Sequence, residues 1–337
     1  MNTDMRKCLI GLLIVLFSCE KPSEEVPVNV SFSLSGLQTK VTGVSYADES
    51  AVVRWTLFVF DMSGAWFRYG SSADAAPLVL RLQAGRPYRC LALVNCPLSG
   101  SGALNPATVS SAGELAGKVA DLADNEPGRL LMFGEALLIP SAQTQSKTIY
   151  VKRLVSRVDV PGISIDFSSC PEWDGKSLML RHIYVTNACK TTTYAEDNLS
   201  VPSALTAWYN PMGWHGYGGA LAGADLLLGD RDINVEIDAA HPYSTPHSFY
   251  FYPNPTEEDS HRTDVWCPRR TRLVIEASVD GETYYYPIDI PLLTRNAVCS
   301  ASNIVIHGPG WSHPEGGTIT GSVLNLDWDA AAAVTLD

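Results

Sequence analysis

The sequence lacks an apolar run long enough to cross a membrane. The apolar run near its start, Leu9 to Phe17, has nine residues and no longer one follows, whereas a helix needs about 20 residues to span the hydrocarbon core of a bilayer. Charge is scarce as well: charged residues make up 18% of the chain, the formal net charge is −12, and there is no basic run. Nucleic acids are bound through clusters of Lys and Arg, so the composition argues against a nucleic-acid partner.

The motifs that carry common catalytic and metal chemistry are missing too. The sequence has no GxSxG nucleophile elbow, no HExxH pair and no phosphate-binding loop. It has no CxxC pair to support a zinc or redox site, and no pair of carboxylates stands out as the acid and base of a glycosidase. We therefore expect a non-enzymatic protein without a metal or a cofactor.

The cysteines limit the disulfide bonds that can form. Six of the eight cysteines follow the N-terminal region, and six cysteines allow three disulfides in about 15 connectivities. Cys90 and Cys96 cannot pair within one extended strand, because six residues of strand span about 20 Å and a disulfide needs Cα atoms within about 7 Å. The other pairings stay open, and small buried core residues are the alternative role for most of these cysteines.

Short segments in which apolar and polar residues alternate dominate the chain and predict strands. The clearest, residues 28–35, sets Val28, Val30, Phe32 and Leu34 on one face and polar residues on the other. Many such segments and few helical patterns indicate an all-β fold of antiparallel β-sandwiches.

Three further segments predict strands of different kinds. Residues 54–61, RWTLFVFD, are apolar on both faces, which is typical of a central strand. Residues 77–95 read as two strands around an Ala-Gly-Arg-Pro turn. Residues 273–290 form the best hairpin, with Asp280-Gly281 as its two-residue turn.

Only one segment predicts a helix. Residues 111–124, SAGELAGKVADLAD, place Leu115, Val119 and Leu122 at helical spacing after a serine. We expect one short helix in this segment.

The length of the chain indicates two domains. About 320 residues follow the N-terminal region, which is long for a single core. Residues 140–147 are polar and rich in turn formers, and a new strand pattern begins beyond them. The predicted domains are therefore residues 28–147 and 148–337.

The N-terminus has the pattern of an export signal. Arg6 and Lys7 precede the apolar run, which ends in Leu-Phe-Ser-Cys at Cys19. These four residues resemble the lipobox of bacterial lipoproteins, in which the cysteine thiol is acylated and the preceding peptide is removed. The resemblance implies a signal peptide over residues 1–18, lipid on Cys19, and a polar tether over residues 19–27. The alternative is a plain cleaved signal with an incidental cysteine.

Several segments, taken in order, carry a wider resemblance. After the lipobox and the first strand come LQTKVTG, LFVFDMSG, LQAGRPYRCLALVN, LLMFGEALL and VKRLVSRVDV, and near the end come LLTRNAVCSASNIVIHGPG and GSVLNLDWD. Together they cover nearly the whole mature chain. They resemble the fimbrillin family, the pilus subunits and anchors of anaerobic Gram-negative bacteria.

The resemblance implies a fold, a location and a mode of assembly. The fold would be two antiparallel β-sandwich domains in tandem, of the Greek-key, transthyretin-like type, with few short helices. The protein would be an outer-membrane lipoprotein at the cell surface whose partners are other pilus subunits. In stalk subunits of the family, a protease cuts after a basic residue in the loop that follows the first strand, and a strand of a neighbouring subunit fills the vacated groove.

On this chain, the family pattern points to particular residues. Lys40 is the candidate cut site, and Val28, Val30, Phe32 and Leu34 form the displaceable strand. The C-terminal residues 321–337 are the candidate donor strand. Whether the chain is an anchor, a shaft subunit or a tip subunit stays open.

An aromatic, glycine-rich segment supports a second hypothesis. Trp208, Tyr209, Trp214 and Tyr217 lie within residues 206–219. Such a loop can stack on the apolar faces of sugars, and the alternative is a loop whose rings pack on their own domain. The runner-up function is therefore a surface lipoprotein that binds a glycan or a host protein and does not polymerise.

Overall fold

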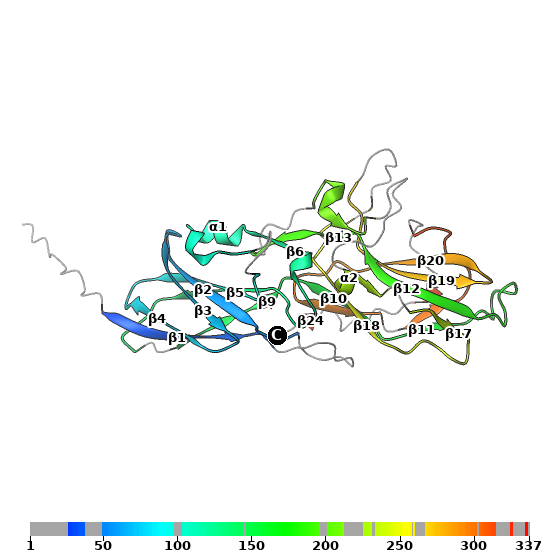
Figure 1. The fold of residues 1–337 in the computed structure, drawn as a ribbon, viewed down its shortest axis with the longest axis horizontal. Coiled ribbons are helices and arrows are strands. Elements are labelled where there is room, and N and C mark those ends of the chain that lie inside the picture. Colours follow the sequence, from blue (N-terminus) through cyan, green and yellow to red (C-terminus); the bar gives the residue numbers. More distant parts are fainter. Residues whose placement is uncertain are drawn as a thin grey trace, which may run out of the picture.

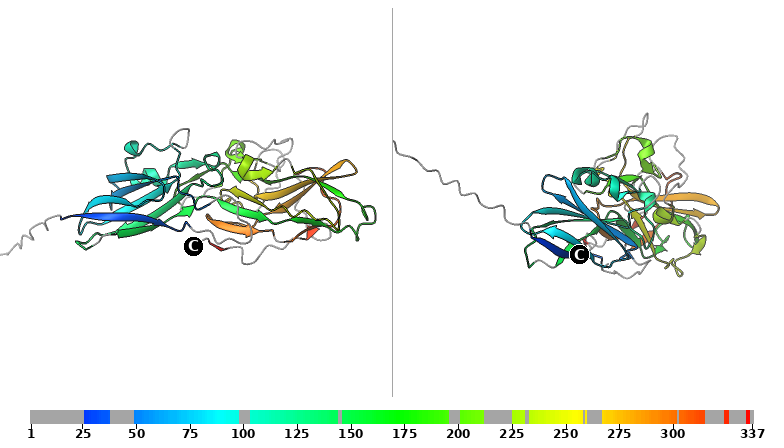
Figure 2. Two further views of the ribbon diagram at one scale, coloured as in Figure 1. Left: turned by 60° about the horizontal axis from the view of Figure 1, so that its bottom comes forward. Right: turned by 60° about the vertical axis from the view of Figure 1, so that its left-hand side comes forward.

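The computed structural model shows an elongated molecule whose strands gather in two groups, one toward each end (Figure 1, Figure 2). We call the group built from β1–β5 and β7–β9 the N-terminal lobe, and the group built from β10–β12 and β16–β24 the C-terminal lobe. The structure describes residues 26–37, 49–97, 103–143, 146–195, 201–211, 225–230, 233–257, 259, 267–301, 303–314, 324–325 and 334–335.

The N-terminal lobe contains two sheets. The smaller has the order β4-β1-β8, and the larger has the order β3-β2-β5-β7-β9. The strands of the smaller sheet are β1 (Pro27–Ser35), β4 (Leu78–Gln83) and β8 (Ser146–Tyr150). Those of the larger sheet are β2 (Arg54–Asp61), β3 (Trp66–Ala73), β5 (Tyr88–Val94), β7 (Met132–Leu138) and β9 (Lys152–Arg153).

Strand β2 lies inside the larger sheet and is buried on both faces, as its sequence predicted. Trp55, Leu57 and Val59 pack in the core between the two sheets. Phe58 and Phe60 point to the opposite face and join the large core that continues into the C-terminal lobe. Because successive strand residues alternate between faces, only a run apolar at every position can satisfy both cores.

The predicted helix is shorter than its pattern suggested. Helix α1 (Ala112–Ala116) starts at the Ser111 cap and gives way at Gly117 to a strand, β6 (Val119–Asp121). Strand β6 pairs with β14 (Thr191–Thr193), so its backbone finds partners outside a helix. Val119 is 51% exposed, and its predicted place on a buried helical face was wrong. Short 3-10 turns, η1 (Pro106–Thr108) and η2 (Leu122–Asp124), flank this region.

The C-terminal lobe also contains two layers of strands. One sheet has the order β16-β12-β19-β20, with β17 on the edge of β12. The other layer contains two sheets, which have the orders β18-β10-β21-β24 and β11-β22-β23. The bounds of the first layer are β12 (Leu178–Thr186), β16 (Gly229–Asp230), β17 (Val235–Ile237), β19 (Arg272–Val279) and β20 (Glu282–Asp289). Those of the second are β10 (Ser156–Val160), β11 (Ile163–Ile165), β18 (His247–Phe251), β21 (Ala297–Ser300), β22 (Ile304–Ile306), β23 (Leu324–Asn325) and β24 (Val334–Thr335).

Short elements complete the fold, which is nearly all β. Strands β13 (Ala188–Cys189) and β15 (Trp208–Tyr209) pair with each other. Two further short helical elements are the 3-10 turn η4 (Leu205–Ala207) and the helix α2 (Asp225–Leu228).

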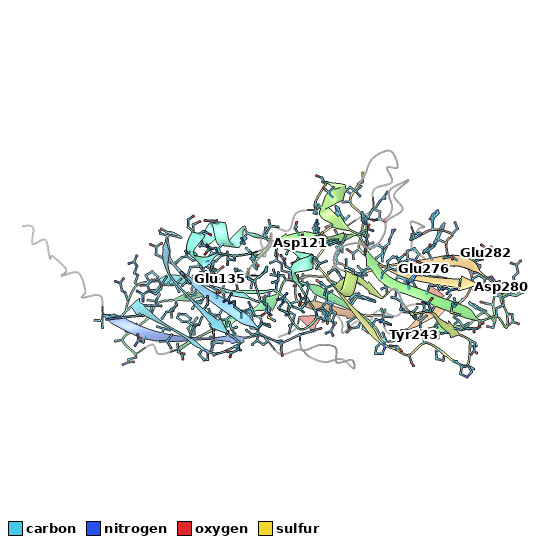
Figure 3. All side chains as sticks on the ribbon, viewed as in Figure 1. Asp121, Glu135, Tyr243, Glu276, Asp280 and Glu282 are labelled. Atoms are coloured by element: carbon cyan, nitrogen blue, oxygen red, sulfur yellow. The ribbon has the colours of Figure 1, made fainter. Side chains whose placement is uncertain are left out.

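The predicted hairpin is present. Strands β19 and β20 pair from Arg272↔Asp289 to Val279↔Glu282, and Asp280 lies at the tip in Figure 3. Asp280 and Gly281 both have positive φ, at 51° and 86°. This backbone is the type I′ geometry that matches the twist of the flanking strands.

The chain leaves the strands of the N-terminal lobe after residue 153, later than the predicted boundary at residue 147. Strand β8 is the parallel neighbour of β1, and β9 pairs with β7, so residues 148–153 belong to the N-terminal lobe. The next strand, β10, pairs with β18 and β21 of the C-terminal lobe. Ser146 and Lys147 already belong to β8, which completes the sheet around β1.

The six cysteines beyond the N-terminal region are all free. Burial raises the pKa of the Cys90, Cys189 and Cys299 thiols to about 12. These three cysteines are small core residues, which was the alternative to disulfide pairing.

Candidate functional site: the groove of the first strand

Strand β1 occupies the middle of its sheet and is paired along both edges. It runs antiparallel to β4 from Pro27↔Gln83 to Phe32↔Leu78. It runs parallel to β8 from Ser31↔Ser146 to Ser35↔Tyr150. Figure 1 shows β1 lying along the length of the N-terminal lobe, with its end toward the C-terminal lobe. The backbone of β1 therefore supplies the hydrogen bonds that β4 and β8 would otherwise lack on their facing edges.

The four alternating apolar side chains of β1 point into the lobe. Val30 and Phe32 are fully buried, and Val28 and Leu34 are partly buried against the same core. On the opposite face, Ser33 shares a hydrogen bond of 3.1 Å with Thr148 at the surface. The core that receives the four side chains consists of Trp55, Leu57, Val59, Leu80, Leu82, Tyr88, Cys90, Ala92, Val94, Met132, Leu138, Ile149 and Val151.

A glycine shapes the end of β1. Gly36 has φ +79°, and a Cβ at this position would lie 2.5 Å from the carbonyl oxygen of Val151. Only glycine fits both the left-handed backbone and this close approach. The chain therefore turns tightly over the end of β8, which brings Leu37 to the junction of the two lobes.

At the junction, the buried Arg153 side chain binds three separate segments. Its Nη2 donates to the Leu37 carbonyl oxygen at 3.0 Å, and its Nε donates to the Glu49 carbonyl oxygen at 3.1 Å. Its Nη1 donates to Oδ1 of Asn296, in the C-terminal lobe, at 2.9 Å. Burial lowers the pKa of Arg153, and Glu49 opposes that effect. One guanidinium thus joins the end of β1, Glu49 and the C-terminal lobe.

Glu49 is fixed by its side chain as well as by its carbonyl group. Its Oε1 accepts hydrogen bonds of 2.5 Å from Arg157 Nη1 and of 2.5 Å from the Tyr250 hydroxyl. Arg157 also pairs with Asp159 at 2.9 Å. Burial opposes the charge of Arg157, but Asp159 and Glu49 together raise its pKa. These groups lie on β10 and β18, so Glu49 is held by the C-terminal lobe.

Sequence reasoning missed this cluster of charges. Arg157 and Asp159 are two residues apart in a strand, so their side chains share a face. That spacing could have suggested an ion pair within β10. Nothing local connects Arg157 to Glu49, which lies 108 residues earlier.

The other predicted site residues are placed in part. Cys19, Lys40, Trp214 and Tyr217 lie outside the described residues. Trp208 is buried and donates from Nε1 to the carbonyl oxygen of Pro202 at 3.1 Å.

Tyr209 is buried as well, and it donates to Asp121, labelled in Figure 3, at 2.8 Å. Burial and the Asp121 carboxylate raise the pKa of Tyr209. The two described rings of the aromatic segment, Trp208 and Tyr209, are buried and do not face solvent.

The described residues of the C-terminal segment pair with strands of the C-terminal lobe. In β23, Leu324 pairs with Ile306 and Asn325 with Val305. In β24, Thr335 pairs with Ala297, next to the residue that binds Arg153. Both described pieces therefore pair antiparallel with strands of the C-terminal lobe, β23 with β22 and β24 with β21.

A cavity of about 290 Å³ opens beside the same junction. Phe133, Glu135 and Tyr150 line it from the N-terminal lobe, and Tyr194 and Arg295 line it from the other side. Arg295 Nη1 donates to the Tyr194 carbonyl oxygen at 2.6 Å, which fixes this wall. Aromatic rings beside charged groups are a lining that can hold a polar ligand with an apolar face.

Within the described part of the chain, no group of three or more His, Cys, Asp or Glu residues could hold a metal ion. No helix among the described residues combines the length and the apolar character needed to cross a bilayer.

Comparison with known proteins relates the fold to fimbrial proteins. No protein-family model matches the sequence, and no curated protein matches it. A protein from Bacteroides eggerthii provisionally assigned to cell adhesion has a TM-score of 0.64 and 16% identity, over 90% of this chain and 96% of that one. The fimbrilin fimA from Porphyromonas gingivalis W83 has a TM-score of 0.60 and 14% identity, over 89% and 96%. The tip fimbrial protein Mfa3 from Porphyromonas gingivalis, with C-terminal truncation, has a TM-score of 0.51 and 12% identity, over 90% and 99%.

The chain thus has the fold of fimbrilins and related fimbrial proteins over nearly its whole length. At the level of the fold, this result confirms the resemblance to fimbrillins found in the sequence.

Proposed function

We propose that this protein is a structural component of a cell-surface pilus, either a fimbrial subunit or the outer-membrane anchor of a pilus, which assembles by strand exchange. The observation that carries the proposal is the pairing and burial of β1 in its sheet. The strand is paired on both edges and fully buries Val30 and Phe32, and it precedes the other strands of its lobe along the chain. The shared fold with fimbrial proteins supports the same role.

Energetics indicate that the β1 groove must always be filled. Complete burial of an apolar side chain is worth about 1.5–3 kcal/mol, so Val30 and Phe32 together contribute roughly 3–6 kcal/mol. Val28 and Leu34 add less because they are partly buried. This sum is a large share of the 5–15 kcal/mol typical of a domain. If β1 left, two unpaired strand edges would flank an apolar floor, and an added strand supplies both kinds of contact.

The proposal assigns a role to each end of the chain. Cys19 carries the lipid that holds the precursor, or a permanent anchor, at the outer membrane. Lys40 is the cut site in a subunit that gives up β1. The C-terminal segment is the donor strand, and its described residues already take part in strand pairing, with β21 and β22.

The same proposal covers the architecture and the partners. The two lobes would be two sandwich domains of the Greek-key, transthyretin-like type. Their strands pair mostly antiparallel, but the predicted all-antiparallel pairing is wrong at three described pairs, β1–β8, β10–β21 and β11–β22, which are parallel. The partners are other pilus subunits, the location is the bacterial surface, and the role is non-enzymatic.

Limited trypsin treatment of the full chain tests the proposal. We expect one early cut at Lys40, loss of the segment that contains β1, and a ladder of oligomers. The matched control is Lys40→Gln, which should stay whole and monomeric. Arg54 lies in β2 and should resist in both chains.

Two results of the trypsin experiment would count against a polymerising subunit. One is a wild-type chain cut at Lys40 that stays monomeric at every concentration. The other is a chain that is never cut at Lys40. The second result, together with capture of a subunit by the uncut chain, would support the anchor role.

A second candidate function is adhesion to a glycan, and the cavity at the lobe junction favours it. A glycan array probed with the purified chain tests this function. Binding that is lost in Tyr150→Ala assigns it to the cavity, and binding lost only in Trp214→Ala assigns it to the aromatic segment. No binding on the array would exclude the glycan ligands tested.

A further inference from the structure

The residues on either side of the segment 38–48 are held by the same guanidinium. Arg153 donates to the carbonyl oxygens of Leu37 and Glu49, at 3.0 and 3.1 Å. The planar guanidinium offers its donors in a fixed fork, so one side chain can bind both oxygens at once. The Arg153 side chain is therefore a direct, non-covalent link between the chain before this segment and the chain after it.

All three members of the link, Arg153, Leu37 and Glu49, are held in place by their surroundings. Arg153 is 2% exposed, which removes competing water. Gly36 turns the Leu37 carbonyl group toward Arg153 through a backbone that no side chain would fit. Glu49 is held in turn by Arg157 and Tyr250.

We propose that Arg153 is a positioning residue that latches β1 in its groove, so that a cut within residues 38–48 does not by itself release the strand. After the cut, β1 keeps its pairing with β4 and β8, and its end stays tied through Leu37. The downstream end, from Glu49 on, stays fixed to the C-terminal lobe. Release then requires that the Arg153–Leu37 hydrogen bond break, as it would when another strand competes for the groove.

The latch also defines what a competing strand must provide. If β1 leaves, Arg153 Nη2 is a buried donor without its carbonyl partner, and such a donor is costly. A strand that restores the hydrogen bond needs a carbonyl oxygen two residues beyond the position of Ser35. It also needs glycine at the position of Gly36, because any Cβ there meets Val151.

This inference rests on the proposed function only in assuming that the chain is cut, so the test supplies its own cut. In the full chain, residues 41–47 are replaced by the recognition sequence of a sequence-specific protease. After complete cleavage, mass spectrometry after rapid gel filtration measures how fast the N-terminal fragment leaves. The experiment needs neither cleavage at Lys40 nor any oligomer, so its outcome is independent of the pilus assembly test.

We expect the fragment to stay with the wild-type chain and to leave Arg153→Lys about 10- to 100-fold faster, the effect of losing one hydrogen bond to a charged group. Lysine keeps the charge but lacks the fork of donors. The control is Arg89→Lys, the same change at an arginine whose guanidinium binds Glu135, on β7. Release from the wild-type chain at the moment of cutting, or at the same rate from wild type and Arg153→Lys, would overturn the latch.

A peptide competition keeps the test valid even where Arg153→Lys fails to fold. Synthetic amides of residues 26–37 and 26–36 compete with the bound fragment of the cut wild-type chain. A third peptide carries alanine in place of Leu37, which keeps the carbonyl group and removes the side chain. We expect the 26–37 peptide and its alanine version to compete about tenfold or more better than the 26–36 peptide. Equal competition by the alanine version and the 26–36 peptide would refute the role of the Leu37 carbonyl.

Discussion

Replacing Phe32 by alanine should loosen the groove more than any other single change in β1. Phe32 is fully buried in the core between the two sheets of the N-terminal lobe. Truncation of a buried Phe to Ala costs about 3–5 kcal/mol, since contacts are lost and a cavity remains. That cost should fall on the local opening in which β1 leaves β4 and β8, because Phe32 is one of the two fully buried anchors of the strand.

Hydrogen exchange of backbone amides measures this opening directly. Each 1.4 kcal/mol changes an equilibrium constant tenfold, so a loss of 3–5 kcal/mol predicts roughly 100- to several-thousand-fold faster exchange. The effect should appear in peptides covering β4 and β8, the two neighbours of β1. Peptides from the β19–β20 hairpin of the other lobe should keep their exchange rates.

Two control variants separate the role of β1 from general destabilisation. Ser31→Ala changes the adjacent residue on the outer face and should alter stability by less than about 0.5 kcal/mol. Phe58→Ala removes an equally buried ring from the other face of β2, so its largest effect should lie in the core around α1. If Phe32→Ala speeds exchange of β4 and β8 by less than about fivefold, the argument that β1 anchors this sheet fails.

Three further predictions test other parts of the fold. Gly281→Ala should cost about 1–2 kcal/mol because φ is positive there, whereas Gly113→Ala in α1 should stabilise by up to about 1 kcal/mol; thermal unfolding compares the two. A maleimide reagent at pH 8 should label the half-buried cysteines of the native chain before the buried ones, and peptide mapping should find no disulfide. The cysteines labelled first are Cys96, Cys170 and Cys267, and the protected ones are Cys90, Cys189 and Cys299. The Asp238 carboxylate hydrogen-bonds His241 and raises the pKa of His241. This pair therefore stabilises the fold below the ordinary histidine pKa and loses that contribution as pH rises through the raised value. An NMR titration should show that Asp238→Asn returns the His241 pKa to its usual range.

Elements whose information is local could be predicted from the sequence. Strand β1 followed from strict alternation, and β2 from apolar residues on both faces. The β19–β20 turn followed from Asp280-Gly281, since few residues other than these adopt positive φ in succession. In each case the neighbouring residues alone decide the backbone, so no knowledge of distant partners was needed.

Elements that depend on distant partners were not predicted correctly or were missed. Leu115 and Leu122 are both buried, but they lie in separate elements, α1 and η2, because pairing with β14 makes residues between them a strand, β6. The place where the sheets change lobes was missed because β8 belongs beside β1, more than 100 residues earlier. The role of Arg153 depends on three segments that only the folded chain brings together.

The two ends of β1 are held in different ways, and this difference suggests an order for its departure. Among the described residues, those from Pro27 to Val30 pair with β4, and the residue before the strand accepts a further hydrogen bond, from Ala84 N to Val26 O at 2.9 Å. The other end pairs with β8, continues into the hydrogen bond from Val151 N to Ser35 O at 3.0 Å, and finishes at Arg153. A competing strand therefore meets most resistance at the latch, where β1 has the Arg153 hydrogen bond in addition to its strand pairing. Replacement that starts near Pro27 and ends at Leu37 would keep the apolar floor covered throughout, so the lobe need not pass through a state with an empty groove.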